Sequence, residues 1–167
     1  MSTALITGAT QGLGRALAGA LAARGWDLVV TARNASRLAE TVSDLRGHGH
    51  DVVGLAGDVS DAVHRDEVAH VVTEIAGTHG LDLLVHNAST LGPVPLRPPR
   101  DLSAEDLAAV LSVNVVAPQA LTRSLLPTLE AVCARDLGDH VRDLVTVDGI
   151  AHVAGEPDDV VAVPSEV

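Results

Sequence analysis

The chain has 167 residues, 47% of them hydrophobic, and a formal net charge of −11. This length and apolar content suit one domain with a buried core and exclude a disordered chain. The negative charge argues against nucleic acid and anionic membrane surfaces as partners, because both attract basic proteins. The single cysteine, Cys133, excludes an internal disulfide and fits a cytoplasmic location. The sequence has no unbroken run of about 18 apolar residues, so no transmembrane helix is expected.

A glycine-rich stretch near the N-terminus has the clearest local pattern. An apolar run over residues 4–6 stops at Gly8, further glycines stand at Gly12 and Gly14, and a helical pattern covers 13–23. This order predicts a strand, a tight turn and a helix. The N–H groups and dipole at a helix start favour a phosphate, and glycines let a pyrophosphate come close. The alternative is a tight turn without a ligand.

Strands and helices alternate along the rest of the chain. Such alternation is typical of a parallel sheet with helices on both faces. We therefore predict a doubly wound, Rossmann-like α/β fold with about five strands in the order 3-2-1-4-5. The further strands are expected at 26–32, 51–56, 81–86 and 143–148, and the helices at 36–46, 60–77 and 107–134.

The alternation fades after Gly149. Residues 1–149 are expected to form a dinucleotide-binding domain, and residues 150–167 an acidic, poorly ordered tail. A loop over residues 92–99 holds four prolines and fits neither a helix nor a central strand. The eight histidines lack the spacing of a metal site, so no metal is expected.

Polar residues follow the predicted strands at the edge where doubly wound sheets bind ligands. Asp58, after the third strand, can accept a hydrogen bond from an exocyclic amine, or it can act as a helix cap or loop acid. Asn87 ends the fourth strand and either holds a loop over a cofactor or only stabilises the turn. Asn114 interrupts an apolar helical pattern, and a buried amide there would need hydrogen-bond partners. The simpler interpretation of Asn114 is an ordinary core Asn with its hydrogen bonds satisfied.

Arg33 follows the second strand and bears on the choice of cofactor. NAD-binding proteins carry an acidic residue here for the ribose 2′-hydroxyl, whereas NADP-binding proteins carry a nearby arginine. The segment 31–33, Thr-Ala-Arg, contains no acid. A guanidinium can bind a 2′-phosphate through two hydrogen bonds. We expect NADP as the preferred cofactor, with NAD as the alternative; the simpler interpretation of Arg33 is an ordinary exposed arginine.

Four motifs in chain order resemble the short-chain dehydrogenase/reductase family, over about residues 3–127. Residues 7–14 (TGATQGLG) are similar to its T-G-x-x-x-G-x-G motif, and residues 86–89 (HNAS) resemble N-N-A-G. Asp58 and Val59 resemble its D-V element, whose Asp contacts adenine, and Asn114 matches a catalytic-tetrad Asn. The resemblance implies hydride transfer between nicotinamide and a carbonyl or alcohol. It implies a catalytic role for Asn114 and cofactor contacts from Gly8, Thr10, Gln11, Gly12, Leu13, Gly14, Arg33, Asp58, Val59, Asn87 and Ala88.

The sequence also departs from this family. The family's chemistry uses a Tyr-x-x-x-Lys pair, but the chain contains neither Tyr nor Lys. Members that prefer NADP often carry a basic residue where this chain has Gln11. The later helices and strands of the family are missing as well. We therefore expect an incomplete, weakly active or inactive member, and a truncation or altered reading frame would explain why the family pattern stops near residue 135.

Two non-catalytic roles stand as alternatives. The domain either senses a bound cofactor or pairs with another subunit. Missing elements would leave apolar surface exposed, which favours association, and family members often dimerise through the region of residues 107–134. A homo-oligomer through this segment is therefore expected, and a fragment without function is the third alternative.

Overall fold

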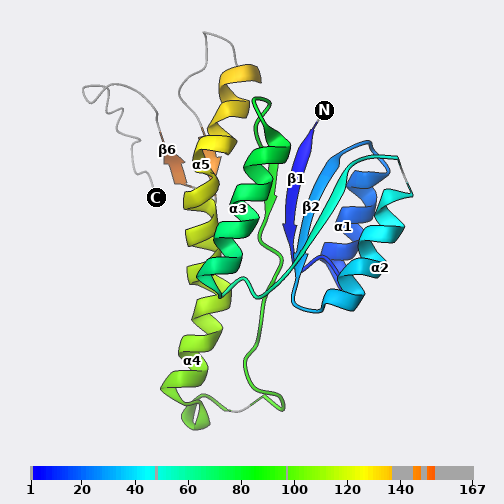
Figure 1. Cartoon of the computed structure of the whole chain (residues 1–167). Coiled ribbons are helices and arrows are strands. Elements are labelled where there is room, and N and C mark those ends of the chain that lie inside the picture. Colours follow the sequence, from blue (N-terminus) through cyan, green and yellow to red (C-terminus); the bar gives the residue numbers. More distant parts are fainter. Residues whose placement is uncertain (1, 48, 97, 137–144, 148–149, 153–167) are drawn as a thin grey trace, which may run out of the picture.

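The computed structural model describes residues 2–47, 49–96, 98–136, 145–147 and 150–152 (Figure 1). The main sheet contains β1 (Thr3–Thr7), β2 (Asp27–Ala32), β3 (Val52–Ala56) and β4 (Leu83–Val85). The helices that alternate with these strands are α1 (Gly12–Ala22), α2 (Ala35–Arg46) and α3 (Ala62–Ala76). A 3-10 turn (Pro99–Asp101) then precedes a long helical rod, made of α4 (Ala104–Leu111), a π-helical turn (Ser112–Val116) and α5 (Ala117–Asp136).

The four strands of the main sheet run parallel in the order β3-β2-β1-β4. Every residue of β1 is buried, because its side chains alternate between two apolar clusters. Ile6 packs in the cluster beneath α1 and α2, whereas Leu5 packs in the cluster beneath α3 and α5. Helices thus cover both faces of the sheet (Figure 1), which confirms the predicted doubly wound α/β fold.

The expected fifth strand does not lie beside β4. Instead, β5 (Val145–Val147) pairs antiparallel with β6 (Ile150–His152) in a separate two-stranded sheet. The predicted strand order therefore holds for its first four positions. The pairing of β5 with β6 is local in sequence, whereas pairing with β4 would need a long-range contact. Because β6 lies within the expected tail and residues 153–167 lie outside the described residues, the domain boundary at 149 stays a prediction.

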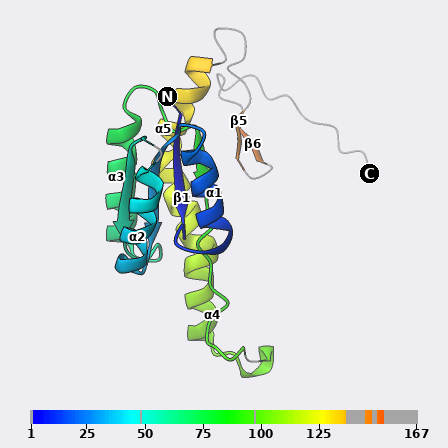
Figure 2. The same cartoon turned by 90° about the vertical axis from the view of Figure 1, so that its right-hand side faces the viewer.

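A capping side chain and a π-helical turn shape the helical rod. Ser103 caps α4, since its Oγ accepts a hydrogen bond from the Asp106 N–H at 3.0 Å. The interruption expected near Asn114 is a π-helical turn, in which the Ala117 N–H donates to the Ser112 carbonyl. The rod extends past the sheet, so that α5 packs on the sheet and α4 projects beyond it (Figures 1 and 2).

Much of this rod is apolar and little covered. By length and composition alone, Ala104–Val132 is apolar enough to cross a membrane, and 17% of its most apolar stretch is buried. One such helix is weak evidence for a membrane span, because core helices of soluble proteins meet the same criterion. The expectation of no transmembrane helix rested on the lack of an unbroken apolar run, and this segment is apolar on average but interrupted by polar residues.

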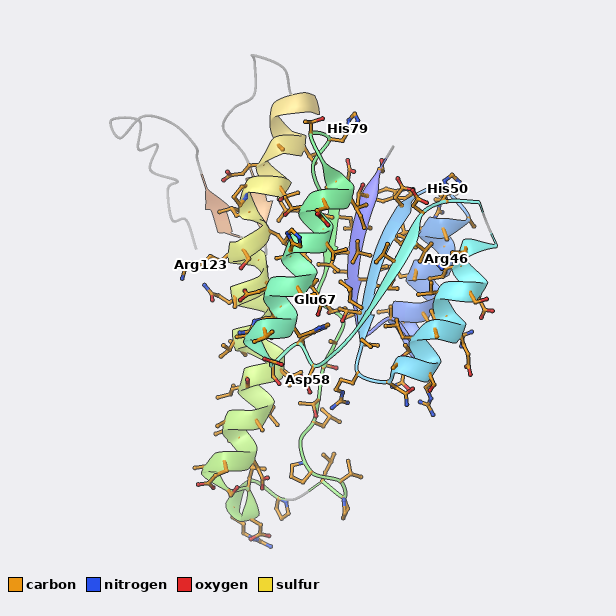
Figure 3. All side chains as sticks on the ribbon, viewed as in Figure 1. Arg46, His50, Asp58, Glu67, His79 and Arg123 are labelled. Atoms are coloured by element: carbon orange, nitrogen blue, oxygen red, sulfur yellow. The ribbon has the colours of Figure 1, made fainter. Side chains whose placement is uncertain are left out.

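The C-terminal ends of the parallel strands meet at one edge of the sheet. Asp58, which follows β3, lies at this edge, whereas His50 and His79 lie at the opposite one (Figure 3). The loops after β1, β2, β3 and β4 all reach the first edge, because parallel strands end on the same side. The fold therefore gathers the loops in which the sequence predicts ligand-binding residues.

Candidate cofactor-binding site

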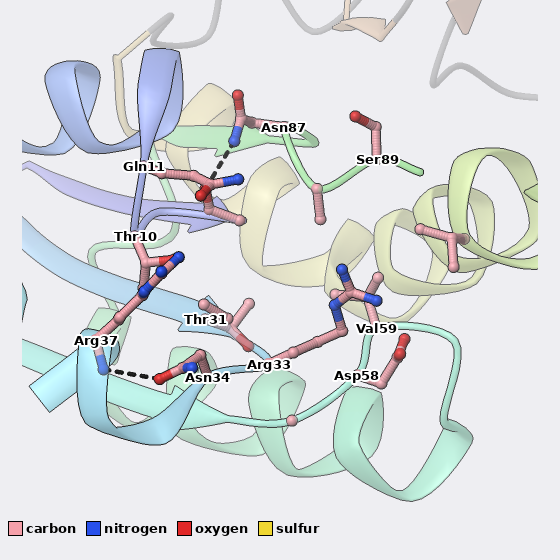
Figure 4. A pocket seen from close by; sticks show the side chains of 15 residues that line it. Thr10, Gln11, Thr31, Arg33, Asn34, Arg37, Asp58, Val59, Asn87 and Ser89 are labelled. Carbon is pink, nitrogen blue, oxygen red and sulfur yellow. Dashed lines mark hydrogen bonds between the residues drawn. The ribbon is translucent and has the colours of Figure 1, made fainter. Parts of the chain in front are cut away.

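A cleft of about 340 Å³ opens at this edge, walled by the loops after all four strands (Figure 4). Eight of the residues predicted to bind a cofactor line it: Gly8, Thr10, Gln11, Arg33, Asp58, Val59, Asn87 and Ala88. The other lining residues are Thr31, Ala32, Asn34, Arg37, Gly57, Ser89 and Val113. Gly12, Leu13 and Gly14 lie outside this lining and form the first turn of α1, where the Leu13 side chain is 76% exposed.

The glycine turn is tied to β2 by main-chain hydrogen bonds. The carbonyl oxygen of Thr31 accepts from the N–H of Gly8 at 2.7 Å and from that of Ala9 at 3.3 Å. Gly8 and Gly12 have φ angles of 69° and 54°, a left-handed conformation that glycine adopts without strain. The side chain of Gln11, at the start of α1, makes no capping hydrogen bond. The positive end of the α1 dipole is therefore available to an anion.

Asn87 holds the same turn from the side of β4. Its Nδ2 donates to the carbonyl oxygens of Thr7 at 3.0 Å and Gly8 at 2.9 Å. The N–H groups of Asn87 and Ala88 both donate to Thr7 Oγ1, at 3.1 and 3.0 Å. Asn87 thus stabilises the glycine turn itself, and its contact with a cofactor stays a prediction.

The glycines allow this close approach between β1, α1 and the end of β4. A Cβ atom at Gly14 would collide with Asn87 Nδ2 and would lie 2.6 Å from the Gly8 carbonyl oxygen. A Cβ atom at Gly8 would lie 2.8 Å from Ala88 Cα. Gly12 has open space around it, so its glycine is required by its φ angle alone.

Two arginines from the loop after β2 and from α2 reach the cleft. Arg33 extends toward Asp58, whereas Arg37 lies on the side of Thr10 (Figure 4). Asn34 caps α2, since its Oδ1 accepts from the Arg37 N–H at 2.9 Å. Sequence reasoning missed Arg37 as a site residue. The signal was its place three residues after a capping Asn, which puts it in the first turn of a helix that starts at the cleft.

The carboxylate of Asp58 is held by the residues that follow it. Its Oδ1 accepts from both the N–H and the Oγ of Ser60 at 2.8 Å. The N-cap of α3 is Asp61, so Asp58 is not the helix cap that the sequence left as an alternative. Burial raises the pKa of Asp58. The two hydrogen bonds from Ser60 and the positive charge of Arg33 lower it by more than burial raises it, so the pKa lies below the ordinary 3.8. Asp58 is therefore ionised at neutral pH.

Asn114 bonds to the main chain of the loop after β4. Its Nδ2 donates to the Thr90 carbonyl at 2.8 Å, and its Oδ1 accepts from the Thr90 N–H at 2.9 Å. The expectation of a buried amide was wrong, because Asn114 is exposed on the rod. It lies next to Val113, which lines the cleft, but is not itself a lining residue. Its catalytic role stays a prediction.

His86 and Ser89, which differ from the N-N-A-G pattern, lie in different surroundings. His86 Nε2 lies 2.8 Å from Thr122 Oγ1, so His86 links the end of β4 to α5. Ser89, which was not among the residues predicted for the site, adds a hydroxyl group to the cleft. Among the described residues, no three His, Cys, Asp or Glu side chains gather as a metal-binding group.

The close contact at Gly14 makes a first prediction. Gly14→Ala should lower the free energy of unfolding by about 1–3 kcal/mol, because the new methyl group overpacks the contact with Asn87. Gly19→Ala on the same helix is the matched control, since nothing lies within 4 Å of its Cβ position. That substitution should stabilise by about 0.5–1 kcal/mol. Urea unfolding measures both, and equal effects would contradict the assigned contact.

Asp58 makes a second prediction about acid stability. Because its pKa is lower folded than unfolded, the carboxylate adds stability above about pH 4, and this contribution is lost as the pH falls through the folded-state value. Asp58→Asn should therefore destabilise at neutral pH and flatten the acid limb of the stability curve. Ser60→Ala should raise the Asp58 pKa seen in an NMR titration. An Asp58 carboxyl that titrates above 3.8 in the unaltered protein would contradict the prediction.

Comparisons with known proteins agree with this geometry. The family model described as short chain dehydrogenase matches residues 2–141. The 1-deoxy-11-beta-hydroxypentalenate dehydrogenase of Streptomyces avermitilis is 34% identical over 128 residues, which are 77% of this chain and 46% of that protein. Dehydrogenase/reductase SDR family member 4 of Homo sapiens is 32% identical over 130 residues, which are 76% of this chain and 44% of that protein.

Solved structures share the fold. L-sorbose reductase from Gluconobacter frateurii, complexed with NADPH and L-sorbose, superposes with a TM-score of 0.70 at 31% identity, over 78% of this chain and 48% of that one. The alcohol dehydrogenase from Thermococcus sibiricus, complexed with 5-hydroxy-NADP, gives 0.71 at 32% identity, over 79% and 55%. The chain spans about half the length of these relatives. Because the family model matches well over half of the chain, the chain belongs to the short-chain dehydrogenase/reductase family.

Proposed function

We propose that the cleft binds a nicotinamide dinucleotide and prefers NADP(H) to NAD(H). The observation that carries this preference is the pair of arginines, Arg33 and Arg37, that line the cleft. The end of β2 and its loop carry no carboxylate to bind a ribose 2′-hydroxyl. Family membership supports the class of cofactor, and the structures of two relatives with NADPH or 5-hydroxy-NADP support the phosphorylated form.

Different groups of the cleft match different parts of such a cofactor. The glycine turn and the start of α1 would hold the pyrophosphate, because N–H groups and the helix dipole attract negative charge there. Asp58 and Val59 would lie beside the adenine, with the ionised carboxylate accepting from its amino group. Arg33 and Arg37 would bind the 2′-phosphate through charge-assisted hydrogen bonds.

The proposed reaction of the whole protein is hydride transfer between the nicotinamide and a carbonyl or alcohol. The bound cofactor supplies or takes the hydride, and a protein group must exchange the proton at the substrate oxygen. The Tyr and Lys that do this in the family are absent from the sequence. Losing general acid–base catalysis costs about 10²–10⁴ in rate. We therefore propose that this chain alone has weak or no turnover.

A second candidate function is non-catalytic subunit pairing, with or without cofactor sensing. The rod exposes Leu107, Leu111, Val115 and Val116 by 45–55% each. Leu107, Leu111 and Val115 stand four positions apart along the rod, and Val116 is adjacent to Val115. Contiguous exposed apolar surface marks association sites. We propose that residues 107–134 form the contact in a homo-oligomer.

The cofactor preference leads to a third prediction. NADPH at 100 times its dissociation constant should stabilise the folded chain by about 2.7 kcal/mol. Arg33→Asp should weaken NADPH by roughly 10- to 100-fold, because a charged hydrogen bond is lost and a like charge faces the phosphate, while NADH changes far less. Isothermal titration calorimetry measures both dissociation constants.

The matched control for that prediction is Arg24→Asp, which changes the same charge at an exposed arginine outside the cleft. It should leave both affinities unchanged. Equal losses of NADPH and NADH in the Arg33 variant would reject its role at the 2′-phosphate. No binding of either cofactor to the unaltered chain would reject the proposed function.

Pairing through the rod leads to a fourth prediction. Leu111→Arg should convert an oligomer into a monomer, because a charge would be buried in the apolar contact. Val63→Arg is the control, since Val63 is 74% exposed on α3 and lies off the rod. Light scattering gives the molar mass of each. A monomeric parent chain, or dissociation by both variants, would contradict the proposed contact.

A further inference from the structure

The buried face of α3 begins with a polar residue. Its buried positions recur every four residues as His64, Val68, Val72 and Ala76, and three of these are apolar. His64 is only 6% exposed. A buried imidazole needs a hydrogen-bond partner, and the Nε2 atom of His64 has one in the Oγ1 of Thr31, 2.7 Å away. Thr31 is completely buried.

Thr31 connects this histidine to the glycine turn. Its side chain bonds to His64, while its carbonyl oxygen accepts the two N–H groups of Gly8 and Ala9. Thr31 also lines the cleft and lies between Arg33 and Arg37 in the view of Figure 4. A single residue of β2 thus carries the contact from α3 to the cradle proposed for the pyrophosphate.

The imidazole ring also supports the loop that carries Asp58. A Cβ atom at Gly57 would collide with the His64 ring, so the loop main chain lies directly on the imidazole. The Gly57 N–H donates to the Ala32 carbonyl at 3.1 Å, which joins this loop to the end of β2. The Nδ1 of His64 faces the Glu67 carboxylate at 3.9 Å. The ring therefore has a defined neighbour on each side.

We propose that His64 is a positioning residue for the adenosine end of the cofactor. It acts through Thr31 and Gly57, which line the cleft together with Arg33, and it does not itself line the cleft. The inference rests on the proposed binding of NADP(H) in this cleft. An apolar residue of similar size would keep the packing of α3 but would release the Thr31 side chain.

The test compares variants that break one hydrogen bond from either end. His64→Leu and Thr31→Val should each raise the dissociation constants of NADPH and of 2′,5′-ADP, its adenosine-side fragment, by about five- to tenfold, the worth of one hydrogen bond. The double variant should bind no more weakly than either single one, because all three lose the same bond. His64→Gln, which can place a polar atom near the Nε2 position, should restore most of the affinity.

His70→Leu is the matched control, since His70 lies on the same helix and its side chain is 72% exposed. It should bind both ligands like the unaltered chain. Folded His64→Leu and Thr31→Val variants that bind within twofold of the unaltered chain would overturn the inference. Additive losses in the double variant would overturn it as well, because the two residues would then act separately.

Amide hydrogen exchange separates this inference from the proposed function. In the cofactor-free protein, Thr31→Val should speed exchange at Gly8 and Gly57 relative to the core of β1, and His64→Leu should do the same if it folds. If the unaltered chain binds no NADPH, the proposed function fails. Unchanged exchange in Thr31→Val would then also overturn the positioning role of His64.

Discussion

The cleft depends on two hydrogen-bonding groups that hold the glycine turn from opposite sides. The carbonyl of Thr31 accepts hydrogen bonds from the N–H groups of Gly8 and Ala9. The Nδ2 of Asn87 donates to the carbonyls of Thr7 and Gly8. The Asn87 contact needs a close approach that a side chain at Gly8 or Gly14 would block. Because the turn is satisfied from β2 and β4, the helix start behind it stays free to bind an anion.

This arrangement places a local positive site on a strongly acidic protein. The net charge of −11 repels a phosphorylated ligand at long range. At physiological ionic strength, charges further away than about 8 Å are largely screened, so the groups within the cleft decide binding. Arg33, Arg37 and the α1 dipole all act at that short range. Arg33 also lies close enough to Asp58 to lower its pKa. The positive charge of Arg33 therefore offsets the repulsion between the Asp58 carboxylate and a bound phosphate.

Sequence reasoning predicted the parts of the site that depend on local patterns. The glycine spacing indicates the turn, and Arg33, Asp58 and Asn87 stand at strand ends that a parallel sheet brings together. It missed Arg37 because only the cap at Asn34 sets which way that first helical turn faces. It expected Asn114 to be buried because its neighbours are apolar, but the rod leaves Val115 and Val116 exposed too. The partner of β5 depends on long-range contacts that no local pattern contains.

The hydrogen bonds that shape the cleft all join residues within the described part of the chain. The bonds of Thr31, Asn87, Asp58 and Asn114 all join residues between Thr7 and Asn114. None of them needs a strand beyond β4 or the residues after the rod. The geometry that would hold a cofactor and the groups that would use it are therefore separable in this fold. A chain can keep the first without the second, and its affinity for a dinucleotide then carries no information about its rate of turnover.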